Sequence, residues 1–182
     1  MKYSMRGNVD PFIVMDVMEN ARKAEESGRK IIHMEVGQPS TAAPSGALER
    51  TSQIIKSNPL GYTVALGLPE LRKKISNLYG RWYNIDLDPS RVIVTSGSSG
   101  AFILSFTALF EEGARVGIGA PGYPSYRQIL KSLGISPVDI VTNLENKFQP
   151  TAKDVVSQNL DGLLVASPSN PTGTILSKDE LS

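Results

Sequence analysis

From Arg91 onward the sequence alternates short apolar runs, turn clusters and helical patterns, and this rhythm constrains the fold more than any other feature. Four runs have the length and apolar content of buried strands: Val92–Thr95, Val116–Gly119, Ser136–Val141 and Leu163–Ala166. Helical patterns lie between and beside them over Ala101–Phe110, Pro124–Leu133 and Pro150–Gln158, the last capped by Thr151. Strands that alternate with helices favour a parallel sheet with right-handed crossovers, so the sequence predicts an α/β domain.

The residues before this region are expected to be mainly helical. A first helix should start with Asp10 as N-cap and Pro11 as its first residue. Further expectations are a strand over Lys30–Val36, a helix over Ser45–Ser57 capped by Ser45, and a helix after Leu68 with Tyr79 and Trp82 as core residues. The Pro- and Ser-rich stretch Gly37–Gly46 is expected to connect an N-terminal segment, residues 1–45, to the main body, residues 46–182.

Composition excludes several kinds of function. The net charge of +1, with 20% charged residues, gives no electrostatic case for a nucleic acid or a membrane surface. Without cysteine there can be no disulfide or thiolate nucleophile, and a single histidine, His33, gives little support for a metal site or a histidine-based triad. No apolar run approaches the ~20 residues of a membrane span, and the N-terminus has no signal-peptide core, so we expect a cytoplasmic protein.

Two glycine-bearing stretches follow predicted strands. Thr95–Ala101, TSGSSGA, opens a helix, where backbone N–H groups and the hydroxyls of Ser98 and Ser99 could bind a phosphate. It matches neither GxGxxG nor a P-loop, and alone it could be an ordinary strand-to-helix turn. Ala120–Tyr126, APGYPSY, presents an aromatic side chain that could stack on a flat heterocycle or be merely structural.

The third stretch, Ser167–Gly173, places Asn170 at a strand end, where its amide could donate to a ligand oxygen. An isolated Asn-Pro-Thr-Gly would be read as a simple turn. Ligands of open α/β sheets bind beyond the carboxyl ends of the strands. The sequence thus predicts a phosphate-binding turn, an aromatic ring that can stack and an amide donor, each after a strand of one sheet. Together these features suit a flat, phosphorylated cofactor.

Four stretches, GYTVALGLPELR, VIVTSGSSGAF, APGYPSY and ASPSNPTGT, occur in an order and spacing that resemble the class I/II aminotransferases. These are fold-type I enzymes that use pyridoxal 5′-phosphate. The resemblance runs from the helix at Asp10 to Thr174 and implies that residues 1–45 belong to the small domain and residues 46–182 to an incomplete large domain. It implies amino acid and 2-oxo acid substrates, as in aspartate or aromatic aminotransferases.

The resemblance also assigns roles to single residues. Gly97, Ser98 and Ser99 match the turn that holds the cofactor phosphate, although many family members have lysine or threonine where this chain has Ser99. Tyr123 matches the aromatic residue that stacks on the pyridine ring. Asn170 matches the asparagine that bonds the ring's phenolic oxygen and lies near the substrate carboxylate.

Two more residues match family positions in the N-terminal half. Tyr62 matches the tyrosine that reaches the phosphate of the neighbouring subunit, which implies a homodimer. Gly37 matches a glycine that lines the substrate pocket.

No catalytic residue is assigned within this chain. In the family, the lysine that forms the Schiff base with the cofactor lies several dozen residues after the Asn-Pro-Thr-Gly turn, and Lys178 resembles a solvated helix-start residue instead. The chain is therefore expected to carry the N-terminal half of an aminotransferase and to be inactive alone.

The family strand order is expected to pair Val116–Gly119 with Ser136–Val141. By the same resemblance, Val92–Thr95 and Leu163–Ala166 should lack neighbours, because those are encoded later.

Two other readings stay open at this point. One is a non-catalytic module that binds a partner or a phosphorylated ligand. The other is a nucleotide-binding α/β domain that uses TSGSSG.

Overall fold

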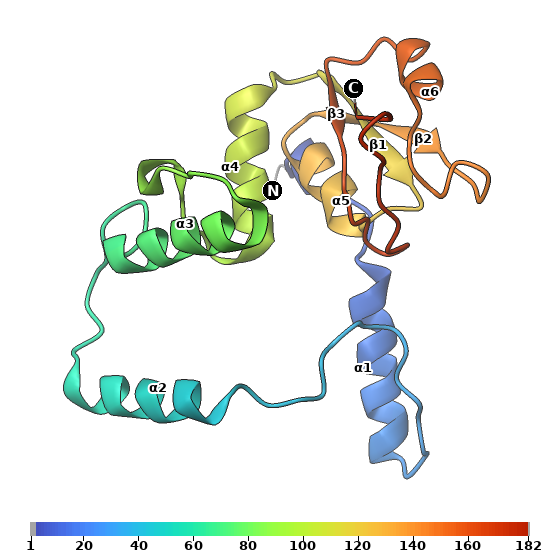
Figure 1. The fold of residues 1–182 in the computed structure, drawn as a ribbon. Helices are drawn as coiled ribbons and strands as arrows, with labels where there is room; N and C mark the ends of the chain where they lie inside the picture. The colour runs from blue at the N-terminus through green and yellow to red at the C-terminus, as the bar shows by residue number, and fades with distance from the viewer. Residues whose placement is uncertain (1–2, 182) are drawn as a thin grey trace. The chain divides into compact units, whose positions relative to one another are not determined.

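A computed structural model of the chain describes residues 3–181, which form two compact units. The first unit contains the chain up to Asp16 and again from Ser96 onward, and the second contains Val17–Thr95. Figure 1 follows the elements in chain order.

A three-stranded parallel sheet forms the centre of the first unit. Its strands are β1 (Arg115–Ala120), β2 (Ser136–Val141) and β3 (Gly162–Leu164), in the order β2-β1-β3. Every residue of β1 pairs with a residue of β2, which confirms the predicted parallel pair. Parallel strands need crossover segments, and the α-helices between these strands supply them.

Three α-helices and one short 3-10 helix, η1 (Met5–Gly7), accompany the sheet: α4 (Gly97–Leu109), α5 (Pro124–Ser132) and α6 (Ala152–Val156). The core cluster contains Phe106 of α4, Val116 and Ile118 of β1, Leu130 of α5 and Ile135. It lies where α4 and α5 cover β1. Helix α6 is shorter than predicted, but Thr151 caps it as expected, in a reciprocal capping box with Asp154.

The expectation that the Leu163–Ala166 strand lacks its neighbours is wrong on one side, because β3 pairs directly with β1. Gly117 of β1 leaves room for side chains that pack on this face of the sheet. A Cβ at Gly117 would lie 2.6 Å from Leu160 Cδ1 and 3.0 Å from Leu163 Cδ1. On its other side β3 is an edge strand within residues 3–181.

The prediction of a strand over Val92–Thr95 is also wrong. This segment belongs to the second unit, and hydrogen bonds to α3 (Pro69–Tyr83) and to the loop before it replace a strand ladder. Arg72 Nε donates to the carbonyl oxygen of Val92 over 2.8 Å, and Val94 N donates to the carbonyl oxygen of Leu66 over 3.0 Å.

The other elements of the second unit are helical. They are α2 (Ser45–Ser57) and the 3-10 helix η2 (Pro89–Arg91); the chain enters the unit within α1 (Ile13–Glu26). Helix α1 begins two residues later than predicted, because Asp10 pairs with Lys131 over 2.6 Å instead of capping it. Ser45 is the first helical residue of α2 rather than its cap, which is Pro44.

Two further expectations for the second unit are wrong. Residues 30–36 form no strand, because no segment of residues 3–181 pairs with them. Tyr79 and Trp82 are 42% and 67% exposed, and both rings contact Tyr83 on the same helix instead of entering a core. None of the helices formed by residues 3–181 is both long and apolar enough to cross a membrane.

Candidate functional site

Two adjoining cavities lie where β1 and β3 end, in the first unit. The smaller has a volume of about 20 Å³ and is lined by Asn170 and Gln149, among others. The second has a volume of about 50 Å³ and is lined by Tyr123. Because both cavities share Gly119, Gly122 and Tyr126, the predicted stacking ring and the predicted amide donor border one continuous region.

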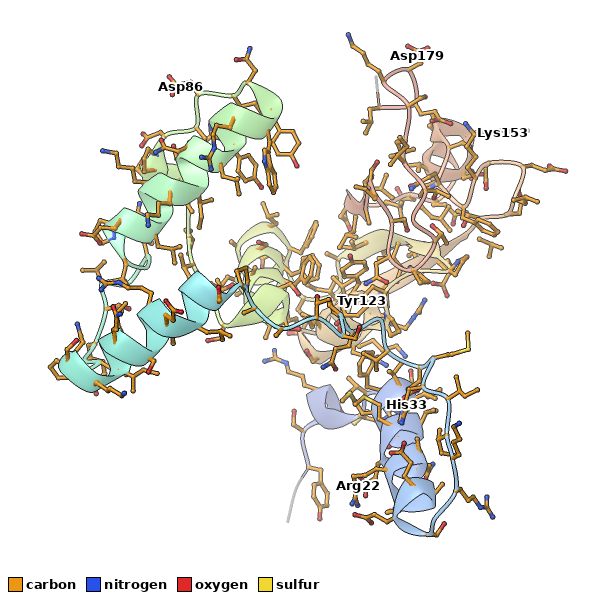
Figure 2. All side chains as sticks on the ribbon, turned by 60° about the horizontal axis from the view of Figure 1, so that its bottom comes forward. Arg22, His33, Asp86, Tyr123, Lys153 and Asp179 are labelled. Carbon is orange, nitrogen blue, oxygen red and sulfur yellow. The ribbon has the colours of Figure 1, made fainter. Side chains whose placement is uncertain are left out.

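The turn after β1 depends on Gly122. A Cβ on this residue would lie 2.4 Å from the carbonyl oxygen of Gly119, so the backbone could not double back so tightly with any larger residue. The turn leads directly into α5, with Tyr123 at its N-cap position (Figure 2).

A row of aromatic rings connects this turn to α4. Tyr123 and Tyr126 have ring centroids 5.3 Å apart, and Tyr126 lies 5.0 Å from Phe102, near the start of α4. The ring centroids of Phe12 and Tyr123 lie 6.3 Å apart in an edge-on arrangement. Neither Phe12 nor Tyr126 therefore stacks flat on the face of the Tyr123 ring. Burial, with a smaller contribution from Tyr123, raises the pKa of the Tyr126 hydroxyl above its ordinary value.

Helix α4 begins at Gly97, so the predicted turn before Ala101 is the first turn of the helix itself. Gly97, Ser98 and Ser99 are all exposed, and the side chain of the N-cap residue, Ser96, makes no capping bond. First-turn N–H groups have no partner inside a helix, and the helix dipole makes this end positive. Phe102, five residues further along α4, contacts Tyr126, but Gly97, Ser98 and Ser99 themselves line neither of the two cavities.

Asn170 lies on the turn that follows β3. The Asn170 side chain is exposed and makes no hydrogen bond to any of residues 3–181, so its amide is available to a ligand. Backbone hydrogen bonds hold the turn around Asn170. Ser169 N donates to the carbonyl oxygen of Thr174 over 2.9 Å, and Gly173 N donates to the carbonyl oxygen of Ser169 over 2.7 Å. Gly173 has a φ of 70°, which glycine adopts without strain.

Sequence reasoning missed Gln149, which is only 3% exposed and lies under this turn. Its amide nitrogen, Nε2, donates to the carbonyl oxygens of Ala166 and Thr174 over 3.2 and 2.9 Å. A single polar residue between Phe148 and Pro150 has no periodicity or motif that could have pointed to it.

Tyr62 and Gly37 belong to the second unit, whereas the cavities belong to the first. Both residues are exposed, and the Tyr62 ring has no covering contact. Their assigned roles stay predictions.

Solved structures share this fold. The chain matches a crystal structure of an aminotransferase from Mycobacterium tuberculosis with a TM-score of 0.94 and 42% identity, over 100% of this chain and 47% of that one. A protein from Silicibacter pomeroyi matches with a TM-score of 0.88 and 58% identity, over 100% of this chain and 46% of that one. The fold is that of the N-terminal part of fold-type I aminotransferases.

Sequence comparison identifies the family. The profile of the family Aminotransferase class I and II matches residues 29–182. The valine–pyruvate aminotransferase of M. tuberculosis is 42% identical over 99% of this chain and 47% of its own length. The chain belongs to the class I and II aminotransferases, whose members depend on pyridoxal 5′-phosphate. It spans about half the length of the curated relatives it matches.

Proposed function

We propose that this chain forms the N-terminal, cofactor-binding part of an aminotransferase that moves an amino group between an amino acid and a 2-oxo acid. The observation that carries the proposal is the convergence of Tyr123 and Asn170 on adjoining cavities at one edge of a parallel sheet. Family membership supplies the reaction class.

The residues present fit pyridoxal 5′-phosphate. The start of α4, with Ser98 and Ser99, offers N–H and hydroxyl donors for a phosphate. Tyr123 offers an aromatic face, and Asn170 offers an amide that nothing else in residues 3–181 uses. Pyridoxal phosphate, when bound, supplies a ring that accepts electrons as a bond to the amino acid's α-carbon breaks.

Each group has a definite task in this proposal. A helix terminus stabilises an exposed anion by only about 0.3–1 kcal/mol, so the α4 backbone and the serine hydroxyls must act together on the phosphate. Tyr123 would hold the cofactor ring by stacking. Asn170 would donate to the phenolic oxygen, and a hydrogen bond to a charged group contributes about 1.5–3 kcal/mol.

The finer assignments follow from the resemblance. Tyr62 would complete the phosphate site of a second subunit in a homodimer, and Gly37 would line the substrate pocket. Residues 1–45 would join the small domain and residues 46–182 the large domain. The substrates would be an amino acid and a 2-oxo acid, of the aspartate or aromatic class by resemblance, or of the aliphatic class suggested by the valine–pyruvate relative.

The lysine that family members attach to the cofactor would lie outside this chain. None of the nine lysines among residues 3–181 lines either cavity, and Lys131, on α5, is engaged with Asp10. We therefore expect the 182-residue chain alone to have no transaminase activity.

The test is Asn170→Ala in the complete protein. Losing about 1.5–3 kcal/mol of charge-assisted bonding should lower kcat/KM by about 10- to 150-fold and shift the absorbance of the bound cofactor, with folding intact. Asn20→Ala is the matched control, because Asn20 lies exposed on α1 and its side chain makes no hydrogen bond to any of residues 3–181. Unchanged turnover and an unchanged cofactor spectrum in Asn170→Ala would reject the proposed site.

A further inference from the structure

Gln149 connects the two ends of the turn that carries Asn170. The Ala166 carbonyl, which accepts one of its bonds, comes just before the turn, and the Thr174 carbonyl, which accepts the other, closes it. The amide nitrogen of Gln149 must face these two carbonyl oxygens, because the amide oxygen has no proton to donate and would face two other oxygens. This fixes the orientation of the Gln149 amide.

The loop that carries Gln149 is itself strongly constrained. It follows β2, and backbone hydrogen bonds within it hold its shape. Phe148 N donates to the carbonyl oxygen of Asn143 over 2.7 Å, and Gln149 N donates to the carbonyl oxygen of Asn146 over 3.0 Å. Lys147 and Phe148 both have positive φ, 53° and 55°, a conformation that side chains disfavour. Strained backbone of this kind persists where the surrounding contacts over-determine it, and it clusters at functional sites.

We propose that Gln149 is a positioning residue, which holds the turn so that the Asn170 amide stays in place for its ligand. The inference rests on the function proposed above and adds a residue to it. The side chain lines the same cavity as Asn170, and its burial keeps water from competing for the two carbonyl oxygens. Without Gln149 the two ends of the turn would keep the backbone bonds of Ser169 N and Gly173 N and the bond from Leu176 N to Ser167 Oγ, but none of these reaches the Ala166 carbonyl oxygen.

Gln149→Met in the complete protein tests this, since methionine has similar length and no donor. Amide hydrogen exchange of the cofactor-free protein should show at least tenfold faster exchange at Ser169 and Gly173, whose N–H groups bond within the turn. The amides of β1 should be unaffected, which shows that the sheet remains folded. Gln128→Met is the matched control, because the Gln128 side-chain oxygen has no partner among residues 3–181.

A double-mutant cycle gives the second readout. Gln149→Met should lower kcat at least tenfold in the wild-type background but less than threefold when Asn170 is already alanine, because both changes remove one function. Independent, multiplicative losses, or unchanged exchange at Ser169 and Gly173, would overturn the inference. Should Gln149→Met fail to fold, fast exchange at these two amides in the wild-type protein would overturn it equally.

The proposed function can fail separately. Full activity of Asn170→Ala would refute the role of Asn170, whereas the exchange measurement would still decide whether Gln149 holds the turn. Reduced activity of Asn170→Ala together with normal kcat and exchange in Gln149→Met would refute only the positioning role.

Discussion

Substituting Gly122 by alanine should distort the turn that presents Tyr123. The added Cβ would meet the Gly119 carbonyl oxygen at 2.4 Å, and that atom is backbone, so it cannot rotate away. Overpacking costs about 1–3 kcal/mol, and a fixed obstacle places this case near the upper end. The reduced entropy of the unfolded chain offsets about 0.4–1 kcal/mol, which leaves a net destabilisation of about 2 kcal/mol.

The assay is urea unfolding of the complete protein, compared with a titration of pyridoxal phosphate. Gly119→Ala is the control for stability, because its Cβ would meet Pro150 at 3.6 Å, an ordinary contact, and should stabilise by about 0.4–1 kcal/mol. Gly122→Ala should also bind the cofactor more weakly, since Tyr123 follows directly. Equal unfolding free energies for the two variants would refute this account of the turn.

Two predictions concern other parts of the chain. Leu130→Ala should destabilise the first unit by about 2–5 kcal/mol in denaturant unfolding, because this side chain is completely buried in the core; a change under about 1 kcal/mol would contradict that packing. The pKa of His33 is raised by hydrogen bonds to Glu35 and then Glu25, so its stabilising effect should be complete below about pH 6.5 and disappear as the pH rises through the raised pKa. Unfolding of His33→Gln and wild type should accordingly differ more at about pH 5.5 than at about pH 9, and a constant difference would count against the contact.

Elements with strong local signals could be predicted from sequence. The bounds of β2 match the expected residues 136–141, and α2 ends at Ser57 as expected, although Ser45 is its first helical residue and not its cap. The capping of α6 by Thr151 was also predictable, since a capping box needs residues only three positions apart.

Elements that depend on partners distant in the sequence could not be predicted in this way. The expected strands at residues 30–36 and 92–95 have strand-like composition, but a strand exists only where a neighbour completes its ladder. The pairing of β3 with β1 joins segments more than forty residues apart, and no local pattern marks which strand becomes the neighbour. Tyr79 and Trp82 show that an apolar helix stripe predicts a buried face only where something covers it.

The same distinction between local signals and distant partners applies to the residues of the candidate site. Tyr123 and Asn170 could be found because each follows a predicted strand, and parallel strands end at a common edge. Gln149 could not be found, because its importance comes from reaching two carbonyl oxygens of a turn that is distant in sequence.

The central claim is that three separate stretches of this chain form one cofactor site. Amide hydrogen exchange of the complete protein, measured with and without pyridoxal phosphate, tests this claim most directly. We expect slower exchange with the cofactor at residues 97–100, 122–126 and 169–174, and little change in α1 and α2. Cofactor binding that leaves all three stretches unprotected would contradict it.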